Sequence, residues 1–208
     1  WGTGADATIR KALLLAISWD ELRASYLIPA STLLYPIPGY PEISGLSTKN
    51  IEEAKKLLKD AQISIESTAP IYISIPESQN YSYLASILKS NWEQLGFTVS
   101  IETKKYSDYY GSLRNNTYTV GITYWIGDFA DPLSFLEMFR AESSLNDSGW
   151  NNDQFEKLLS EALAQKNRND RYSKFAEAEK VLLSEAVIIP LSHNPSVNII
   201  DVDYISGW

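Results

Sequence analysis

The chain has 208 residues, of which 44% are hydrophobic and 12% aromatic, so it can bury the core of one large domain. Its formal net charge is −8, and an acidic surface repels phosphate backbones, which argues against nucleic acid as a partner. The sequence has no cysteine, which excludes disulfides, thiolate metal sites and cysteine nucleophiles. No apolar run is long enough to span a bilayer, and no signal-peptide pattern opens the sequence, so any export signal is expected outside it.

The first part of the chain predicts helices separated by an irregular segment. Apolar residues recur at helical spacing from Ile9 to Ile17, and a short second helix is expected from Trp19. Turn-forming residues then predict an extended, irregular segment: Pro29, Pro36, Pro38, Gly39 and Pro41. The next helix is expected to begin at Asn50, because Asn50 and Glu53 have the spacing of a capping box.

The middle of the chain alternates between strand and helix patterns. Strands are predicted at 71–75, 97–102 and 119–125. Helices are predicted at 81–95, where Gly96 supplies a C-terminal cap, and at 107–115. This order builds right-handed parallel connections, so the expected fold class is α/β, with a mixed, mostly parallel sheet flanked by helices.

The last part of the chain predicts two strongly amphipathic helices and two closing strands. The helices are expected at 155–163 and 172–183, and the strands at 187–191 and 196–200. No internal repeat divides the sequence, which is consistent with a single domain.

A binding site is expected where the third predicted strand ends, because open α/β sheets bind ligands beyond the carboxyl ends of their strands. Tyr124 and Trp125 end that strand, and Asp128 and Asp131 follow shortly after. Two aromatic and two acidic side chains therefore come together where a ligand is expected.

The two aspartates have different expected roles. Asp131 precedes Pro132 and a predicted helix at 133–140, and this order favours a helix-capping role over a ligand role. Asp128 follows Gly127 in a loop, and the local pattern leaves two interpretations open. It is either a turn aspartate bonded to its own backbone, or an anion directed at a cationic group of a ligand.

The sequence offers little for catalysis. Asp128 and Asp131 could form a carboxylate pair, but their spacing across a helix start does not place them on opposite sides of a substrate. His193 is the only histidine and is expected to be structural, since no nucleophile-elbow pattern surrounds the adjacent Ser192. No glycine-rich phosphate loop is present. We therefore expect no catalytic residue, no metal site and no cofactor.

Trp150 lies in a polar loop at 146–152 ahead of a predicted helix. Most of this loop is expected to be an ordinary connection with a helix cap at or near Asn152. Trp150 itself has two interpretations, either a core residue or a residue that lines a binding cleft.

Several segments, in chain order, resemble the oligopeptide- and dipeptide-binding family of ABC-transporter solute receptors. The matching segments are 9–17, 37–40, 54–61, 92–97, 125–132 and 148–152. Trp125, Asp128 and Pro132 coincide with the W, D and P of the family motif W-x-A-D-Y-x-D/E-P. Gly127 in place of alanine and Gln62 in place of glycine depart from the family pattern, and we expect both departures to be minor.

The resemblance implies a lobe of the type II periplasmic-binding-protein fold. Residues 1–208 would be a single C-terminal ligand-binding lobe from a longer receptor, whose N-terminal lobe lies outside this sequence. The family's motif aspartate, at the position of Asp128, binds the α-ammonium of a peptide, which favours the functional interpretation of this residue. The expected site comprises Tyr124, Trp125, Gly127, Asp128 and Trp150.

The implied function is that of an extracytoplasmic solute-binding component of a peptide-type ABC importer. Its implied partners are a short peptide or other small solute, the missing N-terminal lobe and a membrane permease. The implied location is the periplasm or the outer face of the cytoplasmic membrane. The alternatives are a receptor for a sugar, opine, nickel or haem ligand, a signalling receptor of the same fold, and a less favoured carboxylate-dependent hydrolase.

Overall fold

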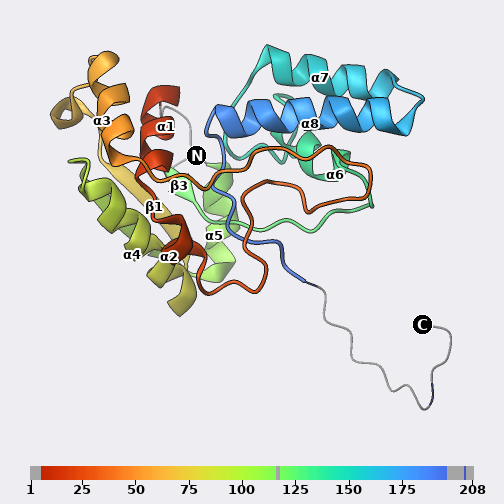
Figure 1. The fold of residues 1–208 in the computed structure, drawn as a ribbon. Helices are drawn as coiled ribbons and strands as arrows, with labels where there is room; N and C mark the ends of the chain where they lie inside the picture. The colour runs from red at the N-terminus through yellow and green to blue at the C-terminus, as the bar shows by residue number, and fades with distance from the viewer. Residues whose placement is uncertain (1–5, 116–117, 196–203, 205–208) are drawn as a thin grey trace.

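The computed structural model describes residues 6–115, 118–195 and 204 (Figure 1). Its α-helices and strands are α1 (Ala7–Ala16), α2 (Trp19–Arg23), α3 (Ile51–Asp60), β1 (Ile71–Pro76), α4 (Gln79–Glu93), β2 (Val99–Lys104), α5 (Tyr106–Arg114), β3 (Val120–Gly121), α6 (Leu133–Leu136), α7 (Asp153–Ala164) and α8 (Arg168–Ser184). Short 3-10 helices lie between these elements: η1 (Ile65–Ser67) precedes β1, and η2 (Glu137–Phe139) follows α6. None of the described helices has the length and apolar character needed to cross a membrane.

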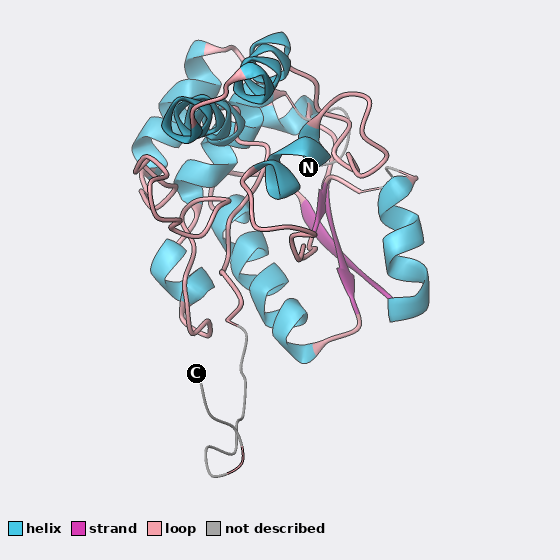
Figure 2. Cartoon of the chain, turned by 90° about the vertical axis from the view of Figure 1, so that its right-hand side faces the viewer, coloured by secondary structure: helices cyan, strands magenta, loops and turns pink. Residues whose placement is uncertain are grey.

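The sheet has the strand order β2-β1-β3, and both pairings are parallel. Because β2 and β3 lie on opposite sides of β1, right-handed connections must place α4 and α5 on opposite faces of the sheet. Figure 2 shows the strands with helices on either side. The predicted α/β class and parallel sheet are therefore confirmed.

Two strand predictions were wrong. The third strand was expected over 119–125, but only Val120 and Gly121 pair with β1, and the next amide, that of Ile122, donates to the hydroxyl of Tyr109. The segment 187–191 does not form a strand, and the nearest pairing is an isolated antiparallel bridge between Pro29 and Ser192. The closing strand expected at 196–200 lies outside the described residues.

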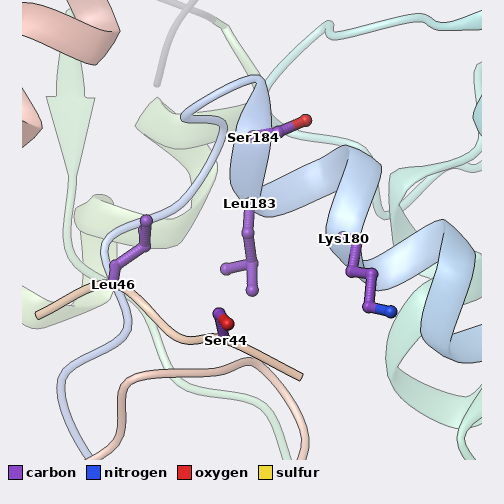
Figure 3. Close-up of a pocket in the computed structure, with 5 residues that line it drawn as sticks. All are labelled: Ser44, Leu46, Lys180, Leu183 and Ser184. Carbon is purple, nitrogen blue, oxygen red and sulfur yellow. The ribbon is translucent and has the colours of Figure 1, made fainter. Parts of the chain in front are cut away.

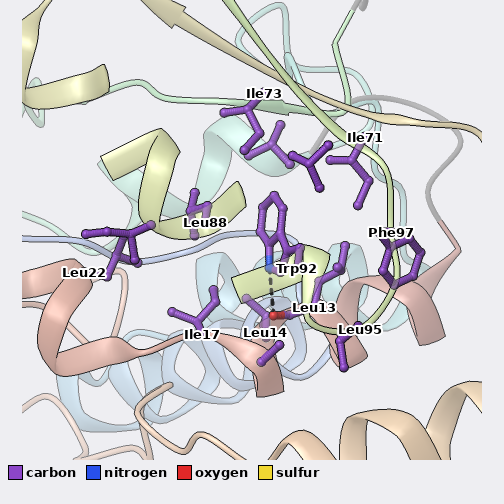
Figure 4. Packing of buried hydrophobic residues seen from close by; sticks show 14 of the residues in the cluster. Leu13, Leu14, Ile17, Leu22, Ile71, Ile73, Leu88, Trp92, Leu95 and Phe97 are labelled. Atoms are coloured by element: carbon purple, nitrogen blue, oxygen red, sulfur yellow. Dashed lines mark hydrogen bonds between the residues drawn. The ribbon is translucent and has the colours of Figure 1, made fainter. Parts of the chain in front are cut away.

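The larger hydrophobic cluster packs the N-terminal helices and α4 against the sheet (Figure 4). Ile73 and Ile75 of β1 are fully buried, as expected for a central strand covered on both faces. Trp92 is also fully buried, and its indole Nε1 donates to the carbonyl oxygen of Leu13 at 3.0 Å. This hydrogen bond gives the buried polar atom of the indole a partner and joins α4 to α1.

A second hydrophobic cluster lies between α7, α8 and α6, on the side of the molecule away from α3 and α4 (Figure 1). Phe155 and Phe175 are fully buried at its centre. The predicted cap at Asn152 is confirmed, because its side chain accepts from the amide of Phe155 at 3.0 Å. The two helices predicted to be amphipathic are present, and they bury their apolar faces against each other.

Two buried charged side chains hold the irregular segment between α2 and α3. Arg23 donates to the carbonyl oxygens of Leu46 at 2.8 Å and Pro190 at 2.9 Å. Burial lowers the pKa of Arg23 to about 10, so the guanidinium stays charged at neutral pH. Glu179 accepts from the amides of Leu33 at 2.9 Å and Leu34 at 3.0 Å. Its other carboxylate oxygen accepts from the hydroxyl of Tyr40 at 2.9 Å.

The start of α3 was predicted correctly in part. The side chain of Asn50 accepts from the amide of Glu53 at 3.0 Å, as the capping-box spacing indicated. The return bond is absent from the described contacts, since the amide of Asn50 donates to the carbonyl oxygen of Leu15 at 2.7 Å. A tertiary contact therefore replaces the local one.

The end of α3 has a Schellman arrangement with a non-glycine residue in the left-handed position. Gln62 has φ +55°, its amide donates to Lys59, and the amide of Ile63 donates to Leu58. The departure from glycine at this position is therefore not minor, because a side chain with a Cβ strains a left-handed backbone.

Replacement of Gln62 by glycine should raise the free energy of unfolding by about 0.5–1 kcal/mol, since it removes the left-handed strain at some entropic cost. The control is Ala61→Gly at the preceding residue, where φ is −80°, and this change should destabilise the protein. Urea denaturation measures both. A destabilised Gln62→Gly variant would contradict the assigned strain.

Glu179 should make stability depend on pH. Burial raises its pKa above the ordinary value of 4.5, and its hydrogen bonds oppose this only in part. The folded protein then keeps the proton to higher pH than the unfolded chain. The stabilising contribution is complete below about pH 4.5 and is lost as pH rises through the raised pKa.

Thermal unfolding across this pH range should therefore show the wild type losing stability relative to Glu179→Gln as pH rises. Tyr40→Phe should extend the pH range of this loss upward, because it removes a hydrogen bond that lowers the pKa of Glu179. Parallel pH profiles for wild type and Glu179→Gln would show that Glu179 does not titrate in this range.

Candidate functional site

The chain that follows β3 carries four of the predicted site residues in one continuous segment. Tyr124 is 50% exposed and Asp128 is also exposed, whereas Trp125 and Gly127 are half-buried. The segment begins at the carboxyl end of a parallel strand, where ligands of open α/β sheets bind. The position predicted from the sequence is therefore compatible with ligand access.

Ser134, at the start of α6, anchors this segment at two points. The amide of Asp128 donates to the Ser134 hydroxyl at 2.7 Å, and the indole Nε1 of Trp125 donates to the Ser134 carbonyl oxygen at 2.9 Å. Ser134 is itself only 1% exposed. A buried residue thus fixes the backbone of Asp128 and the ring of Trp125, which reduces the entropy that a ligand would have to remove on binding.

The carboxylate of Asp128 has no hydrogen bond or ion pair with any other described residue. The structure therefore lacks the side-chain-to-backbone bond that a turn aspartate would make. An exposed carboxylate on an anchored backbone can accept hydrogen bonds from a cationic donor.

Asp131 has the helix-capping role that the sequence predicted. Its Oδ1 accepts from the amide of Leu133 at 3.0 Å, and Pro132 has helical backbone angles. The same oxygen lies 2.9 Å from Nη2 of Arg171, which sequence reasoning did not foresee. Helix α6 is shorter than the expected 133–140, since it continues as the turn η2 and Arg140 is extended.

Trp150 packs against the core of the second cluster. Its ring lies edge-on to Phe155 with centroids 5.0 Å apart. The side-chain amide of Asn146 donates to the Trp150 carbonyl oxygen at 2.8 Å, which stabilises the surrounding loop. These contacts support the core interpretation of Trp150, while its contact with a ligand stays a prediction.

Sequence reasoning missed a group of tyrosines around Tyr124. Tyr106 and Tyr110 of α5 pack edge-on with their hydroxyl oxygens 3.4 Å apart. Hydrogen bonds with Tyr110 and Tyr124 lower the pKa of Tyr106. Tyr106 closely follows the end of β2, so the rule that located Tyr124 at the end of β3 would have located it too.

His193 has the structural role that the sequence predicted. Its Nε2 lies 3.2 Å from the carbonyl oxygen of Leu33, and burial lowers the pKa of its imidazole. The adjacent Ser192 donates to Asn194 and not to His193. Within the described part of the chain, no three acidic or histidine side chains group closely enough to hold a metal ion.

A pocket of about 270 Å³ lies between the segment 44–46 and the end of α8 (Figure 3). Its lining residues are Ser44, Leu46, Lys180, Leu183 and Ser184. The Lys180 ammonium points away from Ser44 and Leu183 in this view. Because none of the predicted site residues lines this pocket, it adds nothing to the site that follows β3.

Residues 3–147 match the family of bacterial extracellular solute-binding proteins, family 5, in its middle region. The chain belongs to this family. The oligopeptide-binding protein OppA of Bacillus subtilis is 30% identical over 143 residues, which are 67% of this chain and 26% of that protein. The periplasmic OppA of Salmonella typhimurium is 26% identical over 214 residues, covering 98% of this chain and 39% of that protein.

Solved structures of peptide-binding proteins have the same fold as this chain. The murein tripeptide binding protein MppA of Escherichia coli superposes with a TM-score of 0.80 at 26% identity, covering 89% of this chain and 39% of that chain. A peptide-binding protein of a peptide ABC transporter has a TM-score of 0.74 at 21% identity and is covered to 90%, as is this chain, so it shows the same fold in a chain of similar extent. These likenesses confirm the predicted type II periplasmic-binding-protein-like lobe.

Membership in an extracellular family confirms the predicted location outside the cytoplasm. The relatives are solute-binding proteins of transporters and not enzymes, which agrees with the expectation that the chain has no catalytic role. The chain spans about two fifths or less of the two OppA proteins, at 39% and 26% of their lengths.

Gly127 has a packing role that the sequence did not reveal. A Cβ atom at this position would lie 2.7 Å from the ring of Phe135 and 3.1 Å from the hydroxyl oxygen of Ser134. The family's usual alanine therefore does not fit here unless Phe135 moves, and the departure is again not minor.

Gly127→Ala should lower the free energy of unfolding by about 1–3 kcal/mol, the usual cost of overpacking. The double variant Gly127→Ala with Phe135→Leu should lose less than the sum of the two single changes, because a smaller side chain makes room for the methyl group. Chemical denaturation of the four proteins measures this coupling. Additive losses would show that the glycine and the ring do not constrain each other.

Proposed function

We propose that the chain is the C-terminal ligand-binding lobe of a two-lobed receptor that captures short peptides outside the cytoplasm for an ABC importer. The observation that carries this proposal is the exposed carboxylate of Asp128, which has no partner among the described residues and stands on a backbone anchored by Ser134. The N-terminal lobe and the membrane permease would be its protein partners.

In this proposal Asp128 accepts hydrogen bonds from the α-ammonium of the peptide. Tyr124 and Trp125, which precede it, would provide apolar surface for the first residues of the ligand. Closure of the second lobe would remove water from the ion pair and strengthen it, since opposite charges attract more strongly at low dielectric constant.

The contrast between the two aspartates supports this assignment. Asp131 is satisfied within the protein by Arg171 and by the amide of Leu133. Asp128 has no such partner among the described residues, so its negative charge is available to a ligand. The same contrast weakens the hydrolase alternative, because a carboxylate that already caps a helix and pairs with arginine is a poor general acid or base.

The names of the relatives support a peptide ligand without fixing it. The matched proteins include oligopeptide- and murein-peptide-binding proteins, and also a probable deoxycholate-binding protein and a heme-binding protein of Haemophilus influenzae. A free amine is common to all peptides with an unmodified N-terminus, and an available carboxylate matches it. The steroid and haem alternatives give Asp128 no comparable role.

The test is the affinity of short peptides for Asp128→Asn, measured by isothermal titration calorimetry on the full-length protein that contains this chain. Affinity should fall about tenfold to a hundredfold, because the variant keeps the shape but loses the charge-assisted bond. The matched control is N-acetylation of the peptide, which should weaken binding to the wild type and have little further effect on the variant.

Two results would overturn this role. Equal affinity of wild type and Asp128→Asn for the free peptide would rule out the α-ammonium contact. Native mass spectrometry of the purified full-length protein would separately test the ligand class, and release of a sugar, metal complex or haem in place of peptides would overturn the proposed substrate.

A further inference from the structure

Tyr109 of α5 occupies an unusual place, because its phenol hydroxyl lies within the hydrogen-bond ladder of the sheet. The side chain is fully buried. The amide of Ile122 donates to the Tyr109 oxygen at 2.7 Å, and that oxygen lies 2.9 Å from the carbonyl oxygen of Ser74 and 2.7 Å from that of Ile122. A side chain from a helix thus contacts the backbones of β1 and of the chain after β3.

The register of the sheet shows which ladder position the hydroxyl contacts. The amides of Ile71 and Glu77 donate to carbonyl oxygens beside β2, so odd-numbered residues of β1 face β2 and the carbonyl of Ser74 faces β3. Ser74 is paired with Gly121. In a continued parallel ladder, the amide of Ile122 would donate directly to Ser74. The hydroxyl of Tyr109 lies within hydrogen-bonding distance of both this donor and this acceptor.

The insertion coincides with the end of β3. Val120 and Gly121 pair with β1, and the chain leaves the ladder at Ile122, although the sequence from 119 to 125 has the composition of a strand. The residues that follow include Tyr124, Trp125 and Asp128. A strand continued to residue 125 would hold Tyr124 and Trp125 in the pleat of the sheet.

The same helix contacts the departing segment a second time. The hydroxyl of Tyr106 raises the pKa of Tyr124, so the two phenols lie close together. Helix α5 also lies close over β3, since a Cβ on Gly121 would come within 2.6 Å of Leu113. α5 is therefore placed to set where the segment after β3 turns away.

We propose that Tyr109 is a positioning residue of the ligand site, whose hydroxyl ends β3 at Gly121 and so directs Tyr124, Trp125 and Asp128 out of the sheet. The part that concerns ligand rests on the proposed function. Tyr109 does not touch the ligand and acts through the backbone of Ile122.

Tyr109→Phe tests this role, because it keeps the ring and removes only the hydroxyl. The matched control is Tyr118→Phe. Tyr118 is also buried, at 8% exposure, and its hydroxyl donates to the carbonyl oxygen of Asp147 at 2.7 Å, away from the β1–β3 ladder. Both changes remove one phenol hydroxyl from a backbone contact, so a general loss of stability should be similar in the two variants.

Two readouts on the full-length protein separate positioning from stability. Hydrogen exchange at the amides of residues 122–125 should become faster in Tyr109→Phe and stay unchanged in Tyr118→Phe. Peptide affinity should fall about tenfold in Tyr109→Phe and stay within about twofold of wild type in Tyr118→Phe.

The outcomes are distinguishable from failure of the proposed function. If the wild type binds no peptide, the proposed function fails, and hydrogen exchange alone decides whether Tyr109 positions the segment. Unchanged exchange at 122–125 in Tyr109→Phe would overturn the inference. Equal affinity losses in the two variants, or a Tyr109→Phe protein that does not fold, would also overturn it, since the hydroxyl would then serve general stability.

Discussion

The long irregular connection between α2 and α3 depends on two buried charged side chains. It has no regular ladder, and the parts that reach the interior, such as Ala30 and Leu34, have buried backbone groups that need partners. Arg23 satisfies carbonyls of the connection and of the chain after α8, while Glu179 satisfies amides of the connection from the opposite side. Removal of either side chain would leave several backbone groups without partners, which is more costly than the loss of one surface ion pair. Arg23 thus holds the connection beside the sheet-centred cluster, and Glu179 holds it beside the helical cluster.

In the candidate site, too, single residues each provide hydrogen-bond partners for more than one group. Ser134 holds both the backbone of Asp128 and the indole of Trp125, and Asp131 holds the start of α6 and Arg171. Once these groups are satisfied, the carboxylate of Asp128 is the acidic group of this segment that has no described partner. A rigid segment with one available charge is suited to recognising a ligand by a single anchoring group, with other contacts supplied by a second surface.

Three positions show structural constraints that the local sequence pattern did not reveal. Gly127 and Gln62 were expected to be minor departures from the family pattern. However, Gly127 packs against Phe135, and Gln62 has a left-handed backbone. The segment 119–125 has strand composition, yet its pairing ends at Gly121, where the next amide donates to the hydroxyl of Tyr109 in α5. The contacts of Gly127 and Ile122 are with residues of helices α6 and α5, so a short window of sequence does not contain them.

The sequence by itself determined the order of helices and strands as far as β3, the parallel connectivity, and the caps at Asn50, Asn152 and Asp131, and it predicts the candidate site after β3. These features follow from periodicity and local hydrogen-bonding chemistry, which act over a few residues. Only the tertiary structure decided the length of β3, the pairing of Asp131 with Arg171, the packing of Trp150 on Phe155 and the tyrosines around Tyr124. Those contacts join residues that are brought together only when the helices pack, and packing depends on the whole chain at once.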